Sequence, residues 1–408
     1  MSLFQIIAVL VALAALFSYL NYRHIGLPST VGLMVMALSL SFVLEGMGAW
    51  GFGMEERAAH FLARIDFNQT VLHGMLGFLL FAGALHVNFE ALAQQRWAVI
   101  LMATFGVVLS TLIIGVLLWW VLDWLSIPLS FIYCLIFGAL ISPTDPIAVL
   151  AILKGLDAPK GLEMKIAGEA LFNDGVGVVL FLVLVGIATG HGHITVADIG
   201  WLFVKEWLGG VVFGLVSGAI ACWLLMRVDN YQVEVLITLA LVMGGYALAE
   251  AWQLSAPLAI VVAGLLIGNH GRRFAISAQT RQHLDAFWEL IDEIFNAVLF
   301  VLVGLEVLVL VYTWDYLLAS LVAIPIVLLA RFISVGVPVG LLRSVQVFAP
   351  NTVKILTWGG LRGGVSVALA LALPVGPERS VILPVTYAVV AFSIIVQGLS
   401  ITRLLRRA

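Results

Sequence analysis

Long hydrophobic runs, separated by short polar or Gly/Pro-rich segments, recur along the whole chain of 408 residues. A helix needs about 20 apolar residues to cross a bilayer. The runs show no period-two alternation, which excludes a transmembrane β-barrel. We predict an all-α polytopic membrane protein with about thirteen transmembrane helices, near residues 3–20, 30–50, 69–89, 97–123, 128–153, 162–189, 200–226, 232–252, 256–268, 285–312, 316–342, 351–374 and 380–402.

Composition supports this class and removes several others. Hydrophobic residues make up 62% of the chain, charged residues 11%, and the mean hydropathy is +1.13, more than a water-soluble core needs. A net charge of -3 gives no reason to expect a nucleic-acid partner. Cys134 and Cys222 lie in apolar runs and are interpreted as core residues. The expected surroundings are membrane lipid, and no cofactor is expected.

Basic residues predict the orientation. Thirteen spans place the two termini on opposite sides, and the connections on one side carry fourteen Lys and Arg residues against four on the other. The positive-inside rule then puts the C-terminus in the cytoplasm and the N-terminus outside a cell (inner) membrane. No Lys or Arg precedes the first run, so we interpret it as a retained span rather than a signal sequence.

Two of the predicted spans are interrupted at corresponding places. The fifth contains the sequence Ser142–Pro146, and the twelfth contains Gly359–Gly364. Paired interruptions of this kind indicate a transporter built from inverted repeats. Two inverted six-helix repeats are expected, centred on residues 97–189 and 316–402.

Asp145 stands between two prolines in the first interruption, next to Thr144. Pro143 and Pro146 donate no backbone hydrogen bond and disfavour helix at the residues before them, so carbonyl groups should be freed here. Carbonyl, hydroxyl and carboxylate oxygens suit a small cation such as Na+. The alternative is a proline kink in which Asp145 only caps the following half-helix.

A second polar group lies in the sixth span. Glu169 and Asn173 are four residues apart and share a helix face, whereas Asp174 is turned about 100 degrees further round. Asp174 could therefore look toward Asp145 while Glu169 pairs with an intramembrane arginine. The alternative is a salt-bridged cluster that only fixes helix packing.

Two arginines are assigned to the membrane interior, Arg331 in the eleventh span and Arg362 in the glycine-rich break. Either could neutralise Glu169, and Arg362 could instead compensate the half-helix ends at the break. We interpret both as structural rather than as contacts to a substrate.

An acidic series lies near the start of the tenth span: Asp285, Glu289, Asp292 and Glu293. Its helical spacing favours an interfacial acidic face. The alternative is attraction of cations toward a funnel.

Together, the Pro143–Pro146 break, Glu169 with Asn173 and Asp174, Arg331, and Gly359–Gly364 resemble the monovalent cation/proton antiporters of the NhaP and eukaryotic sodium/proton exchanger type. The resemblance implies an NhaA-like antiporter fold with two crossed discontinuous helices, and a homodimer. It also implies a scaffold and dimer domain near residues 1–96 and 200–312, with a mobile core near residues 97–189 and 316–402.

The resemblance further implies an ion- and proton-binding group made of Asp174, Asp145, Thr144, Glu169 and Asn173. Within it, Asp174 would bind a proton and Na+ alternately, helped by Thr144, Asp145 and Glu169, and Asn173 marks the electroneutral branch. Asp174, Asp145 and Thr144 would hold the transported Na+. At Ala170 the chain departs from relatives that place a serine near the ion.

The functional hypothesis is a secondary antiporter, not an enzyme, that exchanges Na+ or Li+ for H+ by alternating access. An alternative is a K+/H+ antiporter or another proton-coupled carrier of the same fold. A cation channel would use the same acids but would need a continuous water path. A membrane enzyme would need a metal cluster or a Ser-His pair, and the sequence shows neither signal.

Overall fold

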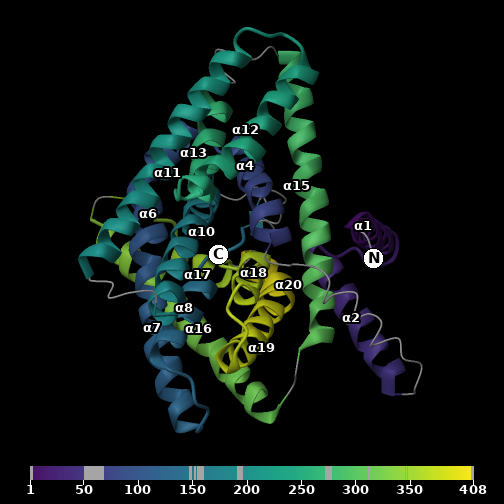
Figure 1. Ribbon diagram of the computed structural model, residues 1–408, viewed down its shortest axis with the longest axis vertical. Helices are drawn as coiled ribbons and strands as arrows, with labels where there is room; N and C mark the ends of the chain where they lie inside the picture. Colours follow the sequence, from purple (N-terminus) through teal and green to yellow (C-terminus); the bar gives the residue numbers. More distant parts are fainter. Residues whose placement is uncertain are drawn as a thin grey trace.

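The computed structural model describes residues 3–49, 69–146, 149–150, 153, 160–190, 196–271, 278–310, 313–344, 346 and 348–405, and every regular element in these ranges is a helix (Figure 1). The predicted all-helical fold is confirmed. In these ranges eight helical segments are long and apolar enough to cross a membrane: Phe4–Ile25, Ser29–Met47, Arg96–Trp124, Gly161–Ala188, Val204–Leu225, Tyr231–Ala251, Trp314–Leu342 and Pro377–Leu405.

The first half of the chain contains α1 (Leu3–Leu20), η1 (Asn21–Ile25), α2 (Ser29–Ala49), η2 (Gln69–Met75), α4 (Leu76–His86), α5 (Phe89–Gln94), α6 (Arg96–Leu101), η3 (Met102–Gly106), α7 (Val107–Trp124), α8 (Phe131–Ile141) and α10 (Lys160–Ala188). The second half contains α11 (Val196–Leu225), α12 (Tyr231–Ala251), α13 (Ala256–Leu266), η4 (Ile267–Gly271), α15 (Ala278–Glu306), η5 (Val307–Val309), α16 (Trp314–Leu342), α17 (Thr352–Trp358), α18 (Gly364–Leu371), α19 (Pro377–Phe392), η6 (Ser393–Gln397) and α20 (Gly398–Leu405).

Each of the thirteen predicted ranges overlaps a described helix, although the number of crossings stays a prediction. The largest boundary difference is at α15, which begins at Ala278 rather than near residue 285. Its first turns are polar but still helical, and Arg281 and Asp285 form an i,i+4 ion pair at 3.8 Å. A hydrophobic run therefore marks only the part of this helix that is apolar.

The helices pack in two groups joined by α10 and α15. In one group α4, α11, α12 and α13 contact one another; in the other, α7, α8, α16, α18 and α19 do. Helix α10 contacts members of both, and α15 extends along the side of the molecule against α1, α2, α4, α12 and α18 (Figure 1). The interrupted helices α8 and α17–α18 belong to the second group.

Close packing of α7 against α8 holds the first interrupted helix in place. A Cβ atom on Gly138 would lie 2.6 Å from the Thr111 carbonyl oxygen, so a larger residue would push the helices apart. One turn later, the Ser142 hydroxyl lies 3.0 Å from the Ser110 hydroxyl and 2.6 Å from the Gly138 carbonyl oxygen. The break thus starts from a fixed helix end.

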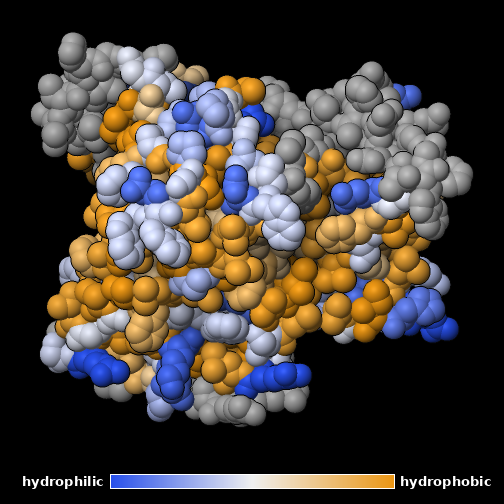
Figure 2. Space-filling model, turned by 90° about the horizontal axis from the view of Figure 1, so that it is seen from below, coloured by the Kyte–Doolittle hydropathy of each residue, from blue (hydrophilic) through white to orange (hydrophobic). Residues whose placement is uncertain are grey.

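The outer surface suits a lipid environment. Figure 2 shows a band rich in hydrophobic residues across one face, with hydrophilic residues on both sides of it. Large side chains such as Leu208, Val212 and Val216 on α11 are about half exposed, which water would penalise and lipid would not. The chain is a multi-pass membrane protein.

Candidate ion-binding site

The two interrupted helices meet at their breaks. Helix α8 ends at Ile141 and α17 ends at Trp358, and non-helical segments follow each. The Asp145 N–H donates to the Leu361 carbonyl oxygen at 2.8 Å, which makes an isolated antiparallel bridge between the breaks. Backbone groups freed by the prolines are therefore partly satisfied by the other broken helix.

Gly363 lets the two breaks approach closely. A Cβ atom at this position would lie 2.5 Å from Oδ2 and 2.8 Å from Cβ of Asp145. Any larger residue would displace the Asp145 carboxylate. The space that Asp145 occupies thus explains the glycine at position 363.

Arg362 lies against the end of α8. Its Nη1 donates to the carbonyl oxygens of Ser142 and Pro143, the latter at 2.8 Å, and its backbone N–H donates to the Ser393 hydroxyl at 2.9 Å. The residue is buried. A positive charge at the C-terminal end of a half-helix offsets the partial negative charge of the carbonyls there.

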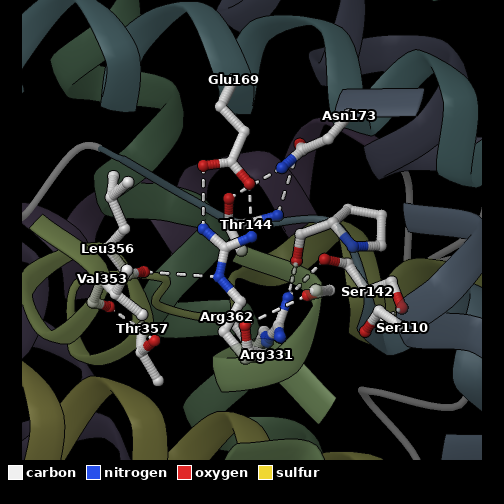
Figure 3. Close-up of polar contacts among 12 residues, drawn as sticks. Ser110, Ser142, Thr144, Glu169, Asn173, Arg331, Val353, Leu356, Thr357 and Arg362 are labelled. Carbon is white, nitrogen blue, oxygen red and sulfur yellow. Dashed lines mark hydrogen bonds and ion pairs between the residues drawn. The ribbon is translucent and has the colours of Figure 1, made fainter. Parts of the chain in front are cut away.

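Arg331 is the arginine that pairs with Glu169 (Figure 3). Its Nη1 and Nη2 donate to the two carboxylate oxygens, the second at 2.9 Å, and its Nε donates to the Leu356 carbonyl oxygen at 3.4 Å. Both side chains are buried. The sequence left Arg331 and Arg362 open as partners, and the structure places Arg331 with Glu169.

Asn173 holds Thr144 (Figure 3). Its Nδ2 donates to the Thr144 hydroxyl at 2.8 Å, and its Oδ1 lies 3.4 Å from the Thr144 backbone nitrogen. Asn173 is completely buried. Both ends of its amide are directed at the break, so Asn173 fixes the position of Thr144 relative to α10.

A cavity of about 450 Å³ lies beside the breaks. Asp174, Asp145 and Thr144 line it, whereas Glu169 and Asn173 do not. Asp174 and Asp145 thus line one cavity from two separate segments of the chain. Among the residues that the structure describes, no hydrogen bond or ion pair occupies the Asp174 carboxylate. The remaining walls come from Leu76, Leu79, Leu80, Gly83, His86, Val87, Pro143, Pro146, Leu150, Glu163, Met164, Ala167, Ala170, Leu171, Glu289, Asp292, Asn296, Leu299, Gly363, Gly364, Val365 and Ser366.

Comparison of this chain with known proteins identifies its family. A family model described as "Sodium/hydrogen exchanger, transmembrane" matches residues 10–407. The chain belongs to this family. It is therefore a secondary antiporter rather than an enzyme, as the sequence predicted.

Relatives in this exchanger family match over nearly the whole chain. The Na(+)/H(+) antiporter NhaP of Pseudomonas aeruginosa is 50% identical over 99% of this chain and 96% of its own length. The Na(+)/H(+) antiporter NhaH of Halobacillus aidingensis is 34% identical over 93% of this chain and 92% of its own length. The structure of the sodium proton antiporter MjNhaP1 from Methanocaldococcus jannaschii shares the fold, with a TM-score of 0.77 and 18% identity over 100% of this chain and 99% of that one.

The exchanger's cavity also contains polar groups from α15. Glu289, Asp292 and Asn296 of α15 line it, and the Asn296 amide donates to the Asp292 carboxylate at 3.0 Å. The sequence favoured an interfacial acidic face for Glu289 and Asp292, with attraction of cations toward a funnel as the alternative. In the structure both residues line the cavity, which agrees with the alternative. The sequence signal was the spacing: Asp292 follows Glu289 by three residues and Asn296 follows Asp292 by four, which puts all three on one helix face.

Proposed function

We propose that this exchanger moves Na+ or Li+ in one direction and H+ in the other, and that the two ions compete for the Asp174 carboxylate. The observation that supports the proposal is the shared cavity of Asp174, Asp145 and Thr144 at the meeting point of two broken helices. Carboxylate, hydroxyl and backbone oxygens are the ligands that hard monovalent cations accept. The names of the sodium/proton antiporters that match this chain agree with the proposal.

Neutralisation elsewhere leaves the Asp174 carboxylate for the ion. Glu169 forms a bidentate ion pair with Arg331, and Arg362 donates hydrogen bonds to carbonyl oxygens at the end of α8. Among the described residues, neither arginine forms a hydrogen bond or an ion pair with Asp174. Asp174 is thus the carboxylate that can accept a proton or a cation without first breaking an ion pair.

Coupling follows from the cost of a bare charge in the membrane. A charged side chain at bilayer depth costs at least about 2.5 to 3.5 kcal/mol. When Asp174 holds a proton or Na+, that charge is neutralised and the ion-binding domain can change sides; when it holds neither, the change is disfavoured. This difference between the occupied and the empty carboxylate is sufficient to couple the movement of Na+ to that of H+.

The proposed moving parts are a core near residues 97–189 and 316–402 and a scaffold near residues 1–96 and 200–312. The separate packing of α4, α11, α12 and α13 from α7, α8, α16, α18 and α19 supports this division. We further propose that the protein is a homodimer in the cell membrane, with its N-terminus outside and its C-terminus in the cytoplasm. The count of basic residues supports the orientation.

Acid pH is expected to weaken apparent Na+ affinity by competition. At pH values where Asp174 is mostly protonated, each further drop of one pH unit lowers the fraction that is free to bind Na+ about tenfold. The apparent dissociation constant for Na+ rises by the same factor. The test is a dye-based measurement of internal pH in proteoliposomes, with Na+, Li+ and K+ added in turn. An Na+ affinity that is equal at about pH 6 and about pH 8 would contradict competition.

Exchange is expected to be insensitive to membrane potential. Because one Na+ replaces one H+ at one carboxylate, no net charge crosses, whereas a single uncompensated charge would feel about 2.3 kcal/mol per 100 mV. The resemblance carried by Asn173 supports the same stoichiometry. Proteoliposomes clamped with K+ and valinomycin at zero and at a negative potential should give equal rates, and a Na+ gradient that follows the potential would contradict the proposal.

A further inference from the structure

A groove on the outer surface of the second helix group is unrelated to the ion cavity. It has a volume of about 380 Å³ and lies between α16, α17 and α20. Its lining includes Phe332 from α16, Lys354 and Trp358 from α17, and Ser400 and Arg403 from α20. Three helices, of which α16 and α17 are consecutive and α20 comes later in the chain, thus form one lateral groove.

The groove is positively charged at one end. Lys354 and Arg403 are exposed, and no acidic residue contributes to the lining. In the part of the chain that the structure describes, neither cation has an ion pair or hydrogen bond. The sequence from Arg343 to the C-terminus contains only one acidic residue, Glu378, so nothing nearby in the chain offsets these charges.

The other end of the groove is apolar and deeper. Phe332 is 50% exposed and precedes the last residue of α16, Leu342, by ten positions. At 1.5 Å per residue it lies about 15 Å along the helix from that end. The Trp358 indole N–H donates to the Ser400 hydroxyl at 2.8 Å, so it is already satisfied and presents ring surface to the groove.

We propose that this groove binds an anionic phospholipid of the cytoplasmic leaflet. Lys354 and Arg403 would hold the phosphate of the headgroup, and an acyl chain would lie against Trp358 and Phe332. The cytoplasmic assignment rests on the excess of basic connections on this side of the membrane, and that leaflet carries the negative surface potential. A soluble anion would use the cations but leave the apolar end of the groove empty.

The occupant would join two parts of the core. Trp358 is the last residue of α17, directly before the break, and the Gln397 amide beneath α20 donates to its carbonyl oxygen at 3.0 Å. A lipid held by Lys354 and Arg403 would therefore connect α17 to α20 at the cytoplasmic end. Binding to the folded state alone stabilises that state.

The test is thermal unfolding of the full-length, delipidated protein in detergent, with phosphatidylglycerol or phosphatidylcholine added. Phosphatidylglycerol should raise the midpoint of the wild type by a few degrees and phosphatidylcholine should not. The K354Q/R403Q variant should lose this difference. A matched control, R96Q/R343Q, also removes two exposed cations, but neither lines the groove, and it should behave as the wild type.

Native mass spectrometry supplies a second readout that needs no unfolding. The wild type should retain one more phosphatidylglycerol per chain than R403Q or K354Q alone. Equal retention of phosphatidylglycerol by the wild type and the single variants would overturn the proposal. So would a K354Q/R403Q variant whose unfolding midpoint phosphatidylglycerol raises as much as that of the wild type. A shift of the same size with inorganic phosphate would also overturn it, because a free anion would then explain the site. Neither measurement depends on ion exchange, so failure here leaves the proposed function untouched.

Discussion

Replacing Asp174 with asparagine is expected to abolish Na+-dependent proton movement while leaving the protein folded. Asparagine keeps the size and one oxygen of the side chain but binds no proton near neutral pH and supplies no charge to a cation. Because Asp174 has no hydrogen bond or ion pair among the described residues, its substitution leaves no buried partner unsatisfied. The loss should be complete, to the level of protein-free liposomes.

The same dye assay measures this loss, and unfolding in detergent measures the fold. Asp292→Asn is the matched control, because Asp292 lines the same cavity from α15 and the substitution is chemically identical. That variant should retain exchange, with weaker apparent Na+ affinity from the reduced negative charge of the cavity. Na+-dependent proton release that persists in Asp174→Asn would remove Asp174 from the mechanism.

Sequence reasoning located the breaks because their causes are local. Pro143 and Pro146 remove backbone donors within a few residues, and clustered glycines at 359–364 weaken helix in the same local way. The all-α membrane class followed from the length of the hydrophobic runs, their lack of period-two alternation and the apolar composition. Asp174 and Asp145 were singled out because intramembrane charge is costly wherever the helices lie.

The sequence could not predict which arginine pairs with Glu169, because the pairing depends on contacts between residues that are distant in the chain. Arg331 is 162 residues from Glu169, and Arg362 is farther still. The choice depends on how α16 and α17–α18 pack around α10. Arg362 is instead engaged by the end of α8, a contact that needs the two breaks to meet.

Asn173 and the acids of α15 illustrate two further limits. Asn173 was predicted to belong to the ion-binding group, and its contact with the ion stays a prediction. In the structure its amide is bonded to Thr144, and the residue does not line the cavity. Its proximity to Asp174 in sequence did not reveal that the two face different neighbours in the fold. Asp292 was assigned to the interface because its helix is polar there, and only the neighbouring helices turn that face into a cavity wall.

Breaking the Glu169–Arg331 pair is expected to produce the largest loss of stability among single substitutions in the site. Both groups are buried and doubly hydrogen-bonded, so Arg331→Gln leaves an unpaired buried carboxylate and Glu169→Gln leaves an unpaired buried guanidinium. Removing one partner of such a pair costs about 3 to 5 kcal/mol. Each single variant should unfold at a markedly lower denaturant concentration than the wild type.

The double variant Glu169→Gln/Arg331→Gln distinguishes the cost of an unpaired buried charge from the cost of altered side-chain packing. With both charges gone, no buried ion remains to be compensated, so the double variant should be more stable than either single one. The exposed pair Arg281–Asp285, at 3.8 Å with side chains 50% and 30% exposed, is the control. Water already solvates its members, so Arg281→Gln should cost less than about 1 kcal/mol. Additive losses in the Glu169 and Arg331 cycle would mean that the two residues stabilise the core through separate contacts, and that the bidentate pair is not what holds α10 to α16.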